Sequence, residues 1–319
     1  MYKTAVLFGG TGFIGRYIIQ QLAQEGYNIK VATRDFEKAK SLKVAGHVGQ
    51  VTSVAIPSFE DTHLNEITKE ADLVINLLGI LYQKGRHTFD KIHTEHAHKI
   101  AKACHHNQVK RFIHFSAIGA DINSKSKYAK SKACGEEEVF KNFPEATIIR
   151  PSIVFGHEDN FFNMFARIMR FSPFIPLIGG GNTKFQPVYV GDIAKAISVL
   201  AGSTQYIGKV FELGGPDIFT FKEILDIIAT LTERKVYYVH VPFFFAKLKA
   251  FFLQLLPTPP LTVDQVRLLE VDNIVSEDCQ YTFKNLNINP RHIMAIVPSY
   301  LKAKPTKKFA LAADSKQNI

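Results

Sequence analysis

The chain of 319 residues has no tryptophan, four methionines and only three cysteines. Cys104, Cys134 and Cys279 lie far apart and form no Cys-x-x-Cys pair. We therefore expect a reducing compartment, without disulfides and without a zinc site. No uncharged apolar run reaches about 18 residues, so we expect no membrane-spanning helix. An apolar stretch begins almost at the first residue, and we expect neither a signal nor a transit peptide.

The charge balance favours an anionic partner. The sequence has 39 basic and 29 acidic residues, a formal net charge of +10, and 46% of its residues are hydrophobic, which is enough for a large core in one or two domains. A phosphate-bearing cofactor, an acidic protein or a lipid surface would suit this charge. We expect no nucleic-acid partner, because the lysines are scattered and no nucleic-acid motif is present.

A glycine motif near the start is the most specific feature of the chain. Gly9, Gly12 and Gly15 are spaced three apart, between an apolar run at 6–8 and a helical pattern at 13–24. Such glycines allow a tight turn, a close approach of the backbone to a pyrophosphate, and close packing of the helix on the strand. The start of the helix would then face the phosphates with its N–H groups. The predicted cradle also includes Thr11, Phe13 and Ile14; a purely structural turn is the alternative.

Alternating strand and helix patterns continue after this motif. Strands are predicted at 6–8, 28–32, 51–56, 72–78, 111–115 and 146–149, and helices at 13–24, 89–106 and 130–140. This order predicts an α/β protein with a Rossmann-like doubly wound parallel sheet. We expect a nucleotide-binding domain at 1–155, to which some later segments return. A small C-terminal α/β cap would follow at 156–303, and a disordered polar tail at 304–319.

The end of the second predicted strand bears on the choice of cofactor. An acidic residue there would bind the ribose hydroxyls of NAD. Thr33 takes that place, Arg34 follows, and Lys38 lies close behind, so a cation is available for a 2′-phosphate. Asp35 is the competing acid. We expect NADP(H) as the preferred cofactor, with NAD(H) as the alternative.

Tyr128 and Lys132 are the candidate catalytic pair. On a helix, a spacing of four places both side chains on one face. The ammonium group would lower the pKa of the phenol and hold the ribose, so that the tyrosine can transfer a proton during hydride transfer. Ser116, at the end of the strand predicted at 111–115, is the third candidate. The alternative is an incidental tyrosine and lysine on a half-exposed helix.

Together these motifs resemble the extended and atypical branches of the short-chain dehydrogenase/reductase family. The similarity extends over Asn76–Gly79, Arg150–Gly156, Phe185–Asp192 and Glu212–Pro216. It implies that Leu77 and Gly79 line the cofactor and that Pro151 to Ile153 lie beside the nicotinamide. Two departures stand out. Aligned on the strand end, the position of the family's substrate-binding serine or threonine falls on Ala117 instead of Ser116. Ile56-Pro57 stands where many relatives have an adenine-binding aspartate.

Within that family, the chain is most similar to the NADPH-containing accessory subunit of respiratory complex I and its bacterial relatives. The matching segments are 79–81, 114–120, 161–165, 171–177, 259–266 and 298–301. This resemblance implies NADPH held as a structural ligand, and respiratory-complex or ubiquinone-synthesis proteins as partners. The expected location is the cytoplasm of a bacterium, with peripheral contact at the inner face of the membrane. The alternatives are an active oxidoreductase or epimerase that uses Tyr128 and Lys132 on a carbonyl or quinone-like substrate, and a sensor of the NADP(H) redox ratio.

The segment 241–256 is rich in phenylalanine and leucine, with interleaved lysines. Burial under the cap is the default expectation, because large apolar side chains are usually buried. Docking on a protein or on a lipid surface is the alternative, which the positive charge favours. His93, His96 and His98 form no metal-binding pattern with a carboxylate or a cysteine, and we expect no metal site.

Overall fold

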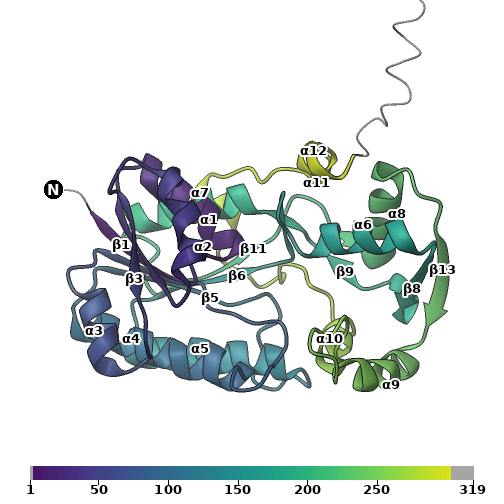
Figure 1. Ribbon diagram of the computed structural model, residues 1–319, viewed down its shortest axis with the longest axis horizontal. Helices are drawn as coiled ribbons and strands as arrows, with labels where there is room; N and C mark the ends of the chain where they lie inside the picture. The colour runs from purple at the N-terminus through teal and green to yellow at the C-terminus, as the bar shows by residue number, and fades with distance from the viewer. Residues whose placement is uncertain (1–2, 303–319) are drawn as a thin grey trace, which may run out of the picture.

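The computed structural model describes residues 3–302, and the predicted tail at 304–319 lies outside them. Its centre is a seven-stranded parallel sheet in the order β11-β6-β5-β4-β1-β2-β3 (Figure 1). The strands are β1 Thr4–Phe8, β2 Asn28–Thr33, β3 Val51–Ala55, β4 Leu73–Asn76, β5 Arg111–Phe115, β6 Thr147–Pro151 and β11 Val210–Leu213. The predicted doubly wound Rossmann-like fold is confirmed, and β11 adds a strand that the sequence analysis did not predict.

Helices cover both faces of this sheet, which makes its strands nearly continuous apolar runs. On one face lie α1 (Phe13–Gln24), α2 (Phe36–Lys40) and α7 (Val190–Gly202); on the other lie α3 (Asp61–Thr68), α4 (His96–His106) and α5 (Lys127–Asn142) (Figure 1). Two separate apolar clusters fill the two interfaces. α7 and β11 come from beyond residue 155 and complete the sheet layer, because α7 packs along α1 and β11 pairs with β6.

The strand order reverses between β1 and β4, which lie side by side. In open parallel sheets a ligand binds at such a reversal, beyond the carboxyl ends of the strands. The turn after β1, the segment after β4 and the segment after β5 all leave the sheet at that edge. This edge is where the predicted glycine motif, Leu77 and Ser116 are found.

The remaining segments form a cap with its own apolar core. Its helices are α6 (Phe161–Phe171), α8 (Phe221–Leu231), α9 (Phe243–Leu253), α10 (Val263–Leu268), α11 (Ile293–Ile296) and α12 (Pro298–Leu301). Its short strands pair as β7 (Val154–Phe155) with β10 (Val188–Tyr189), β9 (Lys184–Phe185) with β12 (Phe219–Thr220), and β8 (Phe174–Ile178) with β13 (Tyr237–Val241). Thr220 and Glu223 form a capping box at the start of α8.

Two expectations differ from the structure. The helix predicted at 89–106 begins with a π-helical turn, Asp90–Glu95, before α4. The expected burial of 241–256 is wrong: in α9 only Ala246 and Ala250 are buried, and the phenylalanines Phe244 and Phe252 are 73% and 62% exposed. No helix within residues 3–302 combines the length and apolar character needed to cross a membrane.

Candidate nucleotide site

The glycine turn is shaped by close backbone contacts. Gly9 has a φ of +78°, in the left-handed region that favours glycine, and a Cβ on it would lie 3.0 Å from the carbonyl carbon of Leu77. A Cβ on Gly15 would lie 2.5 Å from the carbonyl oxygen of Gly10, so only glycine lets α1 pack this closely on the turn. Gly12 is the N-cap of α1 and has no side chain to satisfy the first N–H groups. The first turn of α1 also has no acidic residue, so its N–H groups and helix dipole suit an anion.

At the end of β2, the acid lies beside one cation, Lys38, while the other, Arg34, makes no ion pair with a described residue. Thr33 is the last residue of β2 and is buried. The Asp35 carboxylate caps α2 by accepting a hydrogen bond from the Lys38 backbone N–H at 3.1 Å, and it lies 3.6 Å from the Lys38 ammonium. Arg34 is exposed and makes no ion pair with any described residue. The Asp35 carboxylate is occupied by the N-terminus of α2 and by Lys38. Arg34 is therefore the cation beside this strand end that can bind an anionic ligand.

The candidate catalytic pair lies at the start of α5, opposite the glycine turn. Lys132 is buried, and its Nζ donates a hydrogen bond to the Phe115 carbonyl oxygen at 3.0 Å. A Cβ on Gly79 would lie 3.5 Å from the same Nζ, so the ends of β4 and β5 meet α5 at this ammonium group. Burial lowers the pKa of Lys132 to about 8, an effect that the nearby Glu136 carboxylate partly offsets.

The environment of Tyr128 corrects one expectation. Its ring packs edge-on against Phe89 and His93, with centroid distances of 5.8 and 5.3 Å. Burial raises the pKa of Tyr128 to about 12, instead of the lowering that we expected from Lys132. In this structure the Lys132 ammonium group is anchored to the backbone of β5.

A chain of hydrogen bonds, which the sequence analysis missed, holds α5 in place. The Ile80 N–H donates to His93 Nε2 at 3.0 Å, so Nδ1 carries the proton and donates to Ser131 Oγ at 2.8 Å. The Ser131 hydroxyl in turn donates to the Tyr128 carbonyl oxygen at 2.8 Å. Burial lowers the pKa of His93 to about 2, which keeps the imidazole neutral and this pattern intact. The π-helical turn brings the His93 carbonyl against Gly135, where a side chain would clash.

Ser116 follows β5 directly and is buried, and its Oγ has no hydrogen-bond partner among the described residues. A buried hydroxyl without a partner is uncommon and calls for an explanation, such as a ligand. Pro151 ends β6, and its carbonyl oxygen accepts from the Ile118 N–H at 3.1 Å. The Ile153 N–H donates to Asn273 Oδ1 at 3.1 Å. Asn273 thus connects the segment after β6 to the cap.

A second contact that the sequence did not reveal connects α10 of the cap to α5. The Asp264 carboxylate accepts hydrogen bonds from the Ser126 hydroxyl at 2.9 Å and from the backbone N–H groups of Lys127 and Tyr128 at 2.7 and 3.0 Å. An acid at a helix N-terminus satisfies free N–H groups and complements the helix dipole. The position of Tyr128 therefore depends on the cap as well as on the sheet.

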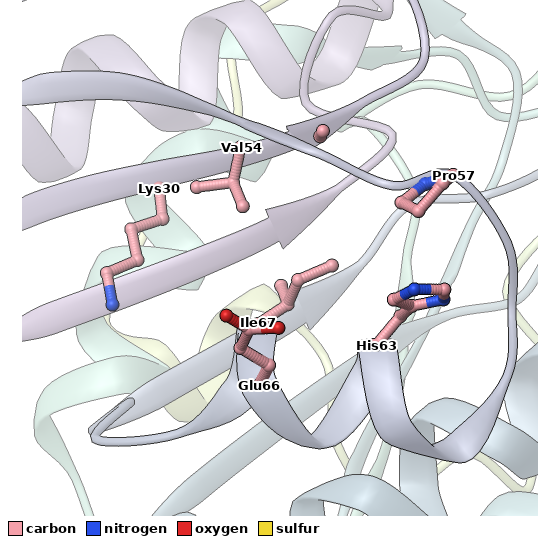
Figure 2. Close-up of a pocket in the computed structure, with 7 residues that line it drawn as sticks. Lys30, Val54, Pro57, His63, Glu66 and Ile67 are labelled. Carbon is pink, nitrogen blue, oxygen red and sulfur yellow. The ribbon is translucent and has the colours of Figure 1, made fainter.

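The edge cavity in Figure 2 is separate from this site. It has a volume of about 460 Å³ and is lined by residues of β2, β3 and α3, among them Lys30, Val54 and His63. None of the predicted site residues lines it. The residues from 3 to 302 contain no group of three histidine, cysteine or acidic side chains that could hold a metal ion.

Two observations fit a bound dinucleotide: a glycine cradle that side chains would fill, and the unpartnered Ser116 hydroxyl at the same sheet edge. Comparison with known proteins agrees with this geometry. Residues 5–214 match the NAD dependent epimerase/dehydratase family.

Two curated mitochondrial proteins are similar over most of the chain. One is NADH dehydrogenase (ubiquinone) 1 alpha subcomplex subunit 9 of Arabidopsis thaliana, 36% identical over 93% of this chain and 77% of that protein. The other is the NADH-ubiquinone oxidoreductase 40 kDa subunit of Neurospora crassa, 32% identical over 94% and 79%. Among solved structures, MoeE5 in complex with UDP-glucuronic acid and NAD superposes with a TM-score of 0.69 at 15% identity, covering 94% of this chain and 97% of that one.

Proposed function

Because this chain belongs to the NAD dependent epimerase/dehydratase family, we propose that it holds NADP(H) as a tightly bound ligand and acts as an accessory protein of quinone-linked respiratory machinery. The observation that carries the nucleotide proposal is that two features occur together. One is the glycine turn, which side chains would fill, and the other is the exposed Arg34 just after β2, which makes no ion pair with a described residue. The respiratory part is supported by the two relatives, whose names place them in NADH–ubiquinone oxidoreductase.

Each part of the dinucleotide has a proposed set of contacts. The pyrophosphate lies on the N-terminus of α1, within the turn formed by residues 9 to 15. Arg34, assisted by Lys38, pairs with the 2′-phosphate. Leu77 and Gly79 line the middle of the ligand, and Pro151 to Ile153 lie beside the nicotinamide. We also propose that the protein lies on the cytoplasmic side, at the inner face of a membrane.

A second candidate function is an active NAD(P)H-dependent reductase or epimerase. It is supported by the presence of both Tyr128 and Lys132 on one helix, with the free Ser116 hydroxyl at the neighbouring strand end. Bound NADP(H) would supply the hydride chemistry. Tyr128 would hold or release a proton at its phenol oxygen, and Lys132 would bind the ribose and stabilise the phenolate.

The test begins with the protein purified under native conditions and then denatured, with the released nucleotide identified by chromatography. We expect near-stoichiometric NADPH. Oxidation of that NADPH is then followed with a panel of quinones and carbonyl compounds. No turnover with NADPH retained supports the accessory role, whereas multiple turnovers that are lost in Tyr128→Phe with binding intact establish the enzyme.

If the purified protein releases no nucleotide, and the stripped protein also fails to bind NADPH or NADH in calorimetry, the proposal is refuted. The Tyr128→Phe variant is compared with Tyr27→Phe, a buried tyrosine that directly precedes β2 at the amino end of the strands, as the matched control. An equal loss of turnover in both variants would show that the tyrosine of α5 has no special role.

A further inference from the structure

The exposed apolar side chains of the protein gather at one end of the cap. Of the eight exposed phenylalanine and tyrosine side chains in residues 3–302, seven lie in two segments, 161–178 and 234–256. These segments comprise α6 with β8 and β13 with α9, and they are joined by the parallel β8–β13 pairing. Figure 1 shows β8, β13 and α9 at the end of the cap away from the central sheet. We call the exposed side chains of these two segments the apolar end.

The β8–β13 pair is apolar on both faces. On one face Ile175 and Leu177 are buried in the core of the cap. On the other, Phe174 is 61% exposed and faces its register partner Tyr237, which is 63% exposed, with ring centroids 5.9 Å apart. Strands alternate their side chains between faces, so an outer face facing water is usually polar. This outer face is therefore built for an apolar environment.

α9 extends the same surface. Apart from its two lysines, this helix is apolar around its whole circumference, yet only Ala246 and Ala250 are buried by the rest of the chain. Phe244, Phe245, Phe251 and Phe252 are all more than half exposed. A helix that is apolar all round is normally buried, so we expect something other than residues 3–302 to cover this one.

The charges on the apolar end identify what covers it. The two segments contain six cations, Arg167, Arg170, Arg234, Lys235, Lys247 and Lys249, and no aspartate or glutamate. Lys247 pairs with Glu270 at 2.7 Å; the other five make no ion pair with a described residue. An exposed surface whose segments combine phenylalanine and leucine with mostly unpaired cations, and contain no carboxylate of their own, is complementary to a bilayer with anionic headgroups.

We propose that the apolar end docks in the plane of an anionic lipid bilayer, with the rings of α9 and of the outer β8–β13 face in the headgroup–acyl boundary and the cations against lipid phosphates. α9 has 11 residues and is about 16 Å long, which suits lying in the interface and is too short to cross a bilayer core of about 30 Å. Lysine is depleted in the cores of protein interfaces, whereas arginine and aromatic residues are enriched there, so binding to vesicles decides between a bilayer and a protein partner. The inference rests on the part of the proposed function that places the chain at a membrane, and it does not depend on nucleotide binding.

Vesicle flotation with the full chain tests this proposal. One set of vesicles contains phosphatidylcholine mixed with phosphatidylglycerol, and the other contains phosphatidylcholine alone. We expect the protein to float with the anionic vesicles and to remain largely free with the neutral ones. High salt should weaken the binding, because it screens the contribution of the cations.

Two pairs of variants locate the surface. Phe244→Ser/Phe252→Ser removes two exposed rings and should abolish flotation, whereas the control Val48→Ser/Leu81→Ser removes exposed apolar side chains of the nucleotide domain and should leave flotation unchanged. Arg234→Gln/Lys249→Gln should weaken binding about thirtyfold, because each cation near an anionic surface contributes about fivefold. Lys69→Gln/Lys84→Gln makes the same charge change elsewhere and should have little effect.

Thermal melting and nucleotide retention verify that each variant is folded, so a loss of flotation can be assigned to the surface. The proposal is overturned if the wild-type protein binds neither kind of vesicle, which would leave a protein as the occupant of the apolar end. It is equally overturned if variants of the apolar end float as the wild type does. Absence of bound nucleotide with normal flotation would refute the nucleotide proposal alone.

Discussion

Arg34→Gln tests recognition of the 2′-phosphate, which we assign to Arg34, separately from recognition of the pyrophosphate, which we assign to the glycine turn. The variant keeps a polar side chain and removes the charge that we expect to meet the 2′-phosphate. A hydrogen bond to a charged group contributes about 1.5–3 kcal/mol, and the exposure of Arg34 favours the lower value. Affinity for NADPH should therefore fall about tenfold. Affinity for NADH, which lacks this phosphate, should hardly change, since the glycine turn and α1 are untouched.

Titration calorimetry on ligand-stripped protein measures both affinities. The control is Lys40→Gln, which makes the same charge change in α2 at a lysine already paired with Glu37. We expect this control to keep the wild-type ratio of NADPH to NADH affinity. An unchanged ratio in Arg34→Gln, or an equal loss for both coenzymes, would refute the role of Arg34 and leave Asp35 as the ribose-binding residue of an NAD(H) site.

Three further predictions concern the same region. Gly15→Ala should destabilise the protein by about 1–3 kcal/mol in urea unfolding and weaken nucleotide binding, because the added Cβ would meet the backbone of Gly10. The control Gly202→Ala should be tolerated in the same titration, because a Cβ there would meet no other part of the described chain within 4 Å. Ser131→Ala should cost about 1–3 kcal/mol in urea unfolding, because the Nδ1–H of His93 loses its acceptor, and a cost no larger than that of the exposed control Ser41→Ala would contradict the hydrogen-bond chain. The pKa of Lys132 is lowered from 10.5 to about 8 in the folded protein, so its penalty on stability is complete below pH 8 and is relieved as the pH rises toward 10.5. Ligand-free wild-type protein should thus gain stability over that range relative to Lys132→Met, and a difference that does not change with pH would show that the buried amine is not the cause.

The nucleotide-binding half was the most predictable part of the molecule. The predicted bounds of α1 and β5 agree with the structure, and the glycine turn lies where the sequence analysis placed it. These features are encoded locally: a glycine that adopts a positive φ, a strand of apolar residues, and a helix with one apolar face. The resemblance to complex I accessory subunits is also confirmed by the two mitochondrial relatives. It was recognisable in the sequence because the motifs that carry it are short and contiguous in the chain.

The surroundings of Tyr128 were not predictable. Spacing placed Tyr128 and Lys132 on one helix face, but it gave no information on the Phe115 carbonyl that holds the lysine or on the burial that raises the pKa of the phenol. His93 was interpreted only as one of many histidines. Its role requires a π-helical turn and a serine 38 residues away, neither of which leaves a periodic signal.

The sequence by itself determined the parallel sheet, the glycine cradle and the positions of the cations near the end of β2, because each depends on residues that are neighbours in the chain. Only the tertiary structure decided that Asp264, 136 residues beyond Tyr128, would cap the helix that carries this tyrosine. It also decided that the aromatic helix α9 would face outward instead of filling the cap. Burial and capping depend on which surfaces meet, and distant segments meet only when the whole chain has folded.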